Sequence, residues 1–123
     1  MKALSHNIFQ VADGEVIQLV TTIDNPPFLA AYTTPPHGST WTETKRTTTS
    51  DTRKFKCPAT SGQQVVFTVS CAEAIPAGAP YSTAVYALKF TSVTNPGDPV
   101  VDSGVAVPQG LGPINQTYTF VVQ

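Results

Sequence analysis

Positive charge is the chemical feature that this sequence concentrates most clearly. The chain has 123 residues, seven lysines and arginines and a formal net charge of −1, so no overall field attracts a polyanion. Five of the seven cations nevertheless fall within one short span, where Glu43 and Asp51 oppose them. These five are Lys45, Arg46, Arg53, Lys54 and Lys56. A span of this kind is either a solvated hairpin or a local anion-binding patch.

Residues for acid–base, nucleophilic or metal chemistry are few and scattered. The two histidines, His6 and His37, are far apart in the sequence, and no cluster of metal ligands accompanies either. There is no phosphate-binding loop and no dinucleotide fingerprint. We read Cys57 and Cys71 as free, buried thiols, because a simple hairpin would place Cys57 near Gln63 and not near Cys71. We therefore expect no enzymatic activity, no metal and no cofactor.

The clearest predicted strand covers residues 63–73. Its apolar side chains fall at every second position, and β-branched and aromatic residues fit a half-buried, pleated surface. Phe67 and Val69 share one face, whereas Thr68 and Ser70 lie on the other. Such a strand needs neighbours on both edges and a cover over its apolar face.

The rest of the chain also favours strands, and no helix is identified. Ala12-Asp13-Gly14 between two apolar runs is a strong hairpin signal. Pairing 51–57 with 64–72, with Phe55 opposite Val65, extends the sheet as an antiparallel meander. The fold class is therefore mainly β, as a single domain with three parts: an N-terminal hairpin (1–24), a main antiparallel sheet (25–98) and a non-helical C-terminal covering arm (99–123).

This arrangement gives the sheet two unlike faces. One is apolar and must be covered, since burying each large side chain stabilises by about 1.5–3 kcal/mol. The other combines lysines with hydroxyl groups, a composition suited to phosphates, although the outer face of an ordinary β-sandwich would look similar. The candidate phosphate-binding residues are Lys54, Lys56, Thr68, Ser70, Lys89 and Thr91, together with Lys45, Arg46 and Arg53, whose register the turn at 48–51 leaves open.

The order of these segments resembles the coat proteins of single-stranded RNA bacteriophages, the levivirus type. The likeness covers about residues 7–98 and runs through NIFQVADGEVIQLV, RKFKCPATSGQQVVFTVSCAE, AIPAGAPYST, AVYALKFTSV and TNPGDP. It is a likeness of pattern and spacing. The C-terminal part departs from it, because the glycines and prolines between 104 and 113 disfavour the helices with which that family ends.

The resemblance implies a structural capsid protein of the virion, assembled in the host bacterial cytoplasm. It implies a homodimer with one continuous sheet, an icosahedral shell and a single-stranded RNA genome or hairpin bound on the open sheet face. The low share of charged residues, 12%, also suits a subunit with extensive contacts. No apolar segment of a signal peptide or a membrane span is present, so we expect no membrane partner.

The alternative is a soluble β-sandwich binding module, for carbohydrate in particular. In that case Trp41, Tyr32 and Tyr81 would serve as stacking platforms. A hydrolase is a more distant third reading.

Overall fold

A computed structural model describes the chain except for residues 25–27, 34–35, 48, 75–83, 98–99 and 107–113. Side chains are described outside 23–35, 48, 71–86, 98–99 and 101–114. The described residues form ten strands and no helix, which confirms the mainly β class for this part of the chain. The strands are β1 (Lys2–Ala3), β2 (Ile8–Val11), β3 (Val16–Asp24), β4 (Phe28–Thr33), β5 (Trp41–Arg46), β6 (Ser50–Lys56), β7 (Gln64–Ala74), β8 (Ala84–Ser92), β9 (Val100–Ala106) and β10 (Ile114–Val122).

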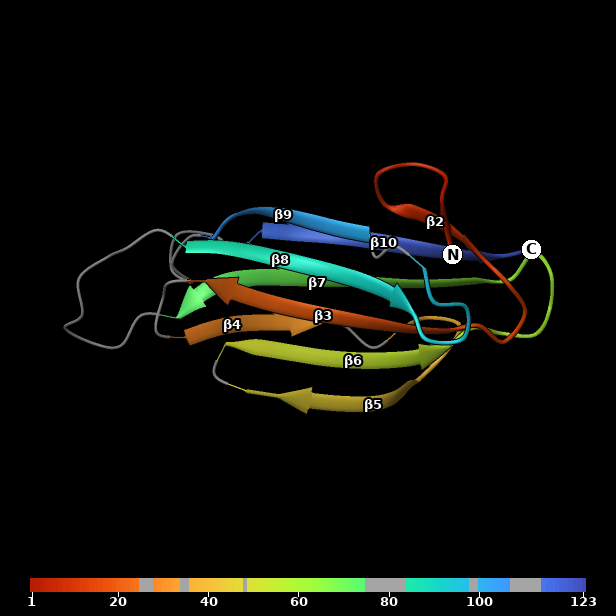
Figure 1. Cartoon of the computed structure of the whole chain (residues 1–123), viewed down its shortest axis with the longest axis horizontal. Coiled ribbons are helices and arrows are strands. Elements are labelled where there is room, and N and C mark those ends of the chain that lie inside the picture. The colour runs from red at the N-terminus through yellow and green to blue at the C-terminus, as the bar shows by residue number, and fades with distance from the viewer. Residues whose placement is uncertain (25–27, 34–35, 48, 75–83, 98–99, 107–113) are drawn as a thin grey trace.

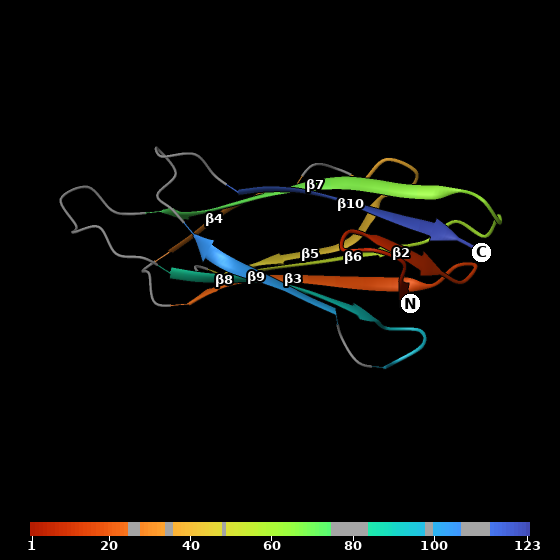
Figure 2. The same cartoon turned by 90° about the horizontal axis from the view of Figure 1, so that it is seen from above.

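These strands pair into two five-stranded sheets. Sheet A has the order β1-β2-β10-β7-β4 and sheet B the order β5-β6-β3-β8-β9. The pairings of these strands are antiparallel except that of β2 with β10, which is parallel. Figure 1 shows the strands running along the long axis, and Figure 2 shows β7 and β10 in one layer and β3, β8 and β9 in the other. The architecture is thus a β-sandwich, in which each sheet covers the apolar face of the other.

The order of the strands corresponds to that of an immunoglobulin-type sandwich. In sheet B the strands β5, β6 and β3 are neighbours, and in sheet A the strands β4, β7 and β10 are neighbours. Strand β2 runs parallel to β10, the last strand of the chain. The hairpin of β8 and β9 is inserted between β7 and β10 and adds two strands beside β3. Because this architecture hosts many unrelated activities, it does not by itself decide the function.

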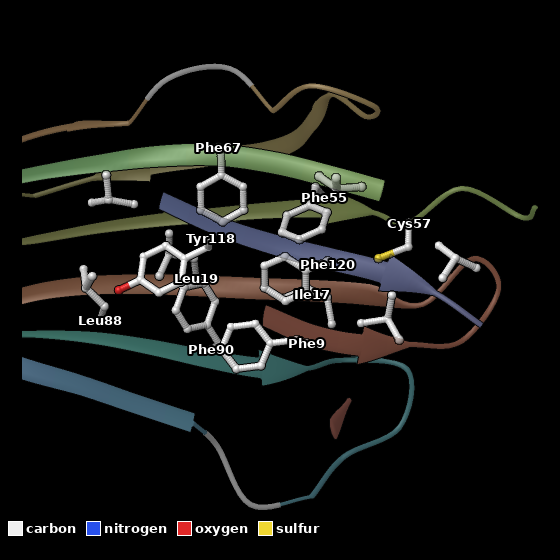
Figure 3. Packing of buried hydrophobic residues seen from close by; sticks show 14 residues of the cluster. Phe9, Ile17, Leu19, Phe55, Cys57, Phe67, Leu88, Phe90, Tyr118 and Phe120 are labelled. Atoms are coloured by element: carbon white, nitrogen blue, oxygen red, sulfur yellow. The ribbon is translucent and has the colours of Figure 1, made fainter. Parts of the chain in front are cut away.

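The core is built from the alternate side chains that point between the sheets (Figure 3). Six aromatic residues lie within it, and each is at most 2% exposed: Phe9, Phe55, Phe67, Phe90, Tyr118 and Phe120. Aliphatic side chains from both sheets fill the remaining space, among them Ile17, Leu19 and Leu88 of sheet B and Val65 and Val69 of sheet A. Strand β7 behaves as its alternation predicts, with Phe67 buried and Thr68 half-buried on the outer face.

The predicted hairpin of 51–57 with 64–72 is wrong. Strand β6 pairs with β3 and β5, whereas β7 pairs with β10 and β4 in the opposite sheet. Phe55 therefore lies opposite Ile17 and Trp41 in its own sheet, not opposite Val65. Each strand has one apolar face. Because the chain passes from one sheet to the other between β6 and β7, the apolar faces of these two strands can bury each other. In a hairpin, both faces would lie on the same side of one sheet and would need a further cover.

The predicted N-terminal hairpin is wrong for the same reason, because β2 belongs to sheet A and β3 to sheet B. The turn between them is a corner, closed where the Glu15 carboxylate accepts a 2.9 Å hydrogen bond from the Ala12 amide. The C-terminal part is not an arm laid across the sheet either. It is non-helical where described, but β10 lies at the centre of sheet A, between β2 and β7.

The prediction of a free, buried Cys57 is confirmed. The side chain of Cys71 lies outside the described residues, so the prediction for it stays a prediction.

Candidate nucleic-acid interface

Four of the predicted lysines share the outer face of sheet B. In β6, Phe55 is buried while Lys54 and Lys56 project to the other side. In β8, Lys89 alternates with buried Leu88 and Phe90 and is exposed on the same side. The register completes the set, since Lys45 of β5 pairs with Thr52 of β6, and Thr52 and Lys89 both pair with Val20 of β3. We call this surface the lysine face: Lys45, Lys54, Lys56 and Lys89 with Gln18, Thr52 and Thr91.

Hydrogen-bonding groups lie between these lysines. Thr91, which the sequence predicted, pairs with Gln18, and Gln18 pairs in turn with Lys54. Gln18 and Thr52 were not predicted. The alternation of Ile17 and Leu19 indicates that Gln18 points away from the core, but only the unexpected pairing of β3 with β6 places it beside Lys54. A polar, cationic sheet face of this kind can contact phosphates through charge and neutral hydrogen bonds together.

Thr68 and Ser70 do not belong to this surface, which corrects their assignment. They project from the outer face of sheet A, so the whole core separates them from the lysines. Their hydroxyls make cross-strand hydrogen bonds to β10. Thr68 Oγ1 lies 3.0 Å from Thr117 Oγ1, and the Ser70 hydroxyl donates to Oδ1 of the Asn115 side chain. The prediction failed because it placed β6 and β7 in one sheet, where these residues would have shared a face with Lys54 and Lys56.

Arg53 and Arg46 also lie away from the lysine face. Arg53 is on the same side of β6 as Phe55, and its guanidinium makes hydrogen bonds of 3.0 and 3.3 Å to the two carboxylate oxygens of Asp51. Arg46 pairs with Asp51 in the register and comes within 3.9 Å of the same carboxylate. Asp51 itself is 2% exposed, so these cations compensate a buried charge and we do not count them among the candidate phosphate contacts.

Trp41 bears on the carbohydrate-binding alternative, because that reading needs an open aromatic platform. Its ring meets Phe55 and Phe67 edge to face, with centroid distances of 5.9 and 5.4 Å. The Arg53 guanidinium lies over the ring, 5.4 Å from its centroid. Trp41 therefore closes the edge of the core. Tyr32 and Tyr81, the other two platforms of that reading, have side chains outside the described residues.

Among the described residues, the pKa values of Glu15 and Cys57 are shifted, and both residues lie at the turn between β2 and β3, where the Cys57 amide donates a 2.8 Å hydrogen bond to the Glu15 backbone carbonyl. Burial raises the pKa of the Cys57 thiol to about 12, and the nearby Glu15 carboxylate adds to this. Burial acts to raise the pKa of Glu15 as well, but hydrogen bonds from Ala12 and Ser92 and the amino group of Met1 outweigh it and leave that pKa lowered. Shifted pKa values often mark reactive sites, but here both have structural causes.

Within the part of the chain that the structure describes, no group of three histidines, cysteines or acidic residues is arranged to hold a metal ion. No helix there is long and apolar enough to cross a membrane.

No family model, no curated protein and no solved structure matches this chain.

Proposed function

We propose that this protein is a non-enzymatic, single-stranded RNA-binding β-sandwich that contacts phosphates through the lysine face. The observation that carries the proposal is the gathering of four of the seven cations of the chain on one outer sheet face. Glu43 is the one carboxylate among the described side chains of this face, so these described side chains together carry a formal charge of +3 in a protein of net charge −1.

The spacing of the lysines on this face supports a single strand as the ligand. Paired strands are about 4.8 Å apart and alternate residues along a strand about 6.8 Å apart, so the four lysines span roughly 14 Å by 14 Å. An extended backbone can lie across such a surface, with its phosphates near the ammonium groups and its sugars near Gln18, Thr52 and Thr91.

The test is binding of fluorescent oligouridylate by anisotropy over a range of salt concentrations. For single strands, log K falls with log[salt] with a slope of about −0.7 per phosphate contact, so four contacts give about −2.8. Changing Lys54, Lys56 and Lys89 together to Gln should reduce the slope by about 2, since three contacts are lost.

Control variants distinguish binding through the lysine face from a general effect of removing positive charge from the protein. Lys2→Gln removes one cation from β1, at the edge of sheet A, and should change binding much less than Lys56→Gln. Circular dichroism and urea unfolding check that the variants stay folded. A slope that the triple substitution leaves unchanged would remove the lysine face from the account. Binding to sulfated polysaccharide but not to oligouridylate would reject RNA as the ligand.

We further propose that the protein acts as a coat subunit, which dimerises and assembles into a shell around RNA. The low share of charged residues, 12%, supports this proposal. The outer face of sheet A supports it too, because its described side chains in β7 and β10 are uncharged. Neither of the two hairpins that contributed to the levivirus likeness is formed, so this proposal rests on these surface properties. Size-exclusion chromatography and electron microscopy of the expressed protein test it. Closed particles with nuclease-protected RNA would support it, and a monomer without particles would reject it.

A further inference from the structure

Glu43 interrupts the lysine face at a defined place. It pairs with Lys54 in the register of β5 with β6, and its carboxylate forms a 3.0 Å ion pair with the Lys54 ammonium. The two side chains are 47% and 28% exposed, so water and solutes reach both. The strand register changes between Trp41 and Glu43, and after this irregularity Glu43 and Lys45 both share the outer side with Lys54.

The position of Lys54 makes this contact consequential. Lys56 lies two residues after Lys54 in β6, about 6.8 Å away. Lys45 lies in the neighbouring strand β5, opposite Thr52, which is two residues before Lys54; it is about 8 Å from Lys54. Lys54 is therefore the middle member of a cationic line along β5 and β6, with Lys89 standing about 10 Å to the side of β6. A bound polyanion that follows this line must pass over the ion pair.

We infer that Glu43 is a built-in competitor for the anion, which occupies Lys54 in the free protein and limits the affinity of the lysine face. This inference rests on the proposed function. A phosphate that approaches Lys54 must displace the carboxylate and tolerate its charge nearby. An exposed ion pair of this kind contributes little to stability, so its main effect is on the potential that a ligand meets.

Two substitutions of Glu43 test the inference. Glu43→Gln keeps the size of the side chain, releases Lys54 and removes a repulsive charge. We expect it to tighten oligouridylate binding about two- to five-fold at low salt, because the phosphate at Lys54 no longer has to displace a carboxylate. Glu43→Asp keeps the charge and is the matched control, expected to bind as the wild type does.

The double variant Glu43→Gln with Lys54→Gln shows whether the effect acts through Lys54. Without that lysine, the gain from Glu43→Gln should shrink to the smaller contribution of general charge, and the two substitutions should be non-additive. The urea midpoints of all variants should stay close to that of the wild type.

The possible failures are distinguishable. If the wild type does not bind oligouridylate in a salt-dependent manner, the proposed function fails. If the wild type binds and Lys54→Gln weakens binding, but Glu43→Gln does not strengthen it, the function stands and the competitor role of Glu43 is rejected.

Discussion

Phe55 of β6 and Phe67 of β7 meet edge to face across the core, with ring centroids 5.7 Å apart, although their strands belong to opposite sheets. Trp41 packs on both rings from the edge of sheet B, and Phe120 packs on both from β10. The aromatic cluster therefore joins the two layers, and removing a ring should weaken the whole sandwich.

Phe67→Ala tests this role of the cluster. Phe67 is 2% exposed, and truncation of a buried phenylalanine typically lowers the free energy of unfolding by about 3–5 kcal/mol. Urea denaturation followed by tryptophan fluorescence measures the loss, since the single Trp41 packs on Phe67. Ile8→Ala, at a residue that is 38% exposed on β2, is the control and should cost much less. Equal losses for the two variants would contradict the packing.

The sequence predicted the faces of these strands better than their partners. Alternation depends only on which side chains need burial, so Phe55, Phe67 and Phe90 were correctly assigned to an apolar face and Lys54 to the opposite one. It carries no information on whether two apolar faces lie side by side in one sheet or oppose each other across a core. The two-sheet arrangement was therefore missed.

The candidate site shows the same division. Lys54, Lys56, Lys89 and Thr91 share a face because each lies in a strand of sheet B, so their relation survives the change of topology. Thr68 and Ser70 lie on the outer face of sheet A instead, because their assignment to the lysine face depended on the pairing of 51–57 with 64–72. Lys45 became assignable only from the β5 register, and the role of Asp51 as partner of Arg53 depends on burial that composition cannot show.

Gly38 provides a test of the connection that leads from β4 towards β5. Its φ of +95° lies in the region that favours glycine, and a Cβ there would collide with the backbone carbonyl of Gln64. The adjacent His37 bridges to Val66 by two backbone hydrogen bonds of 2.8 and 3.0 Å, so the backbone cannot easily withdraw. We expect Gly38→Ala to destabilise the protein by more than the roughly 1–2 kcal/mol of left-handed strain alone.

Two other glycines separate strain from collision in the same urea assay. Gly62 has a φ of +89° but open space around its Cβ position, so Gly62→Ala should show the strain only. Gly97 has neither feature, and Gly97→Ala should be close to neutral. Any order other than Gly38, Gly62, Gly97 in decreasing cost would contradict the described turn geometry.

The reactivity of Cys57 reports on the integrity of the core. The thiol is 2% exposed and burial raises its pKa to about 12, so very little thiolate forms at pH 8. In a Cys71→Ser background, where Cys57 is the only cysteine, we expect Ellman's reagent to react slowly with the native protein and at an ordinary rate in 6 M guanidinium. The sign is fixed by the raised pKa: the folded state resists deprotonation, so reaction must await opening. Rapid reaction under native conditions, with the circular dichroism spectrum intact, would overturn this assignment.

Glu15 should make the protein sensitive to acid. The carboxylate is 1% exposed, accepts a 2.9 Å hydrogen bond from Ala12 and lies 3.1 Å from the amino group of Met1. Burial raises its pKa, but these partners and Ser92 lower it more, so the folded pKa is below the ordinary value of 4.5. A lowered pKa means that the stabilisation is complete above the unfolded pKa and is lost as the pH falls through the folded one. Glu15→Gln keeps the shape but not the charge, and should lower the free energy of unfolding at pH 7 by about 1–3 kcal/mol.

The pH dependence of stability distinguishes the effect of the buried Glu15 carboxylate from the effect of removing an exposed carboxylate. The wild type should lose stability steeply as the pH falls below about 4.5, whereas Glu15→Gln should show a flatter curve, because the group that takes up a proton on unfolding is gone. Glu43→Gln removes an exposed carboxylate and should leave both the stability at pH 7 and the acid slope nearly unchanged. Urea midpoints for the three proteins at pH 7, 5, 4 and 3 give the comparison. Parallel curves for wild type and Glu15→Gln would show that the buried carboxylate does not couple protonation to folding.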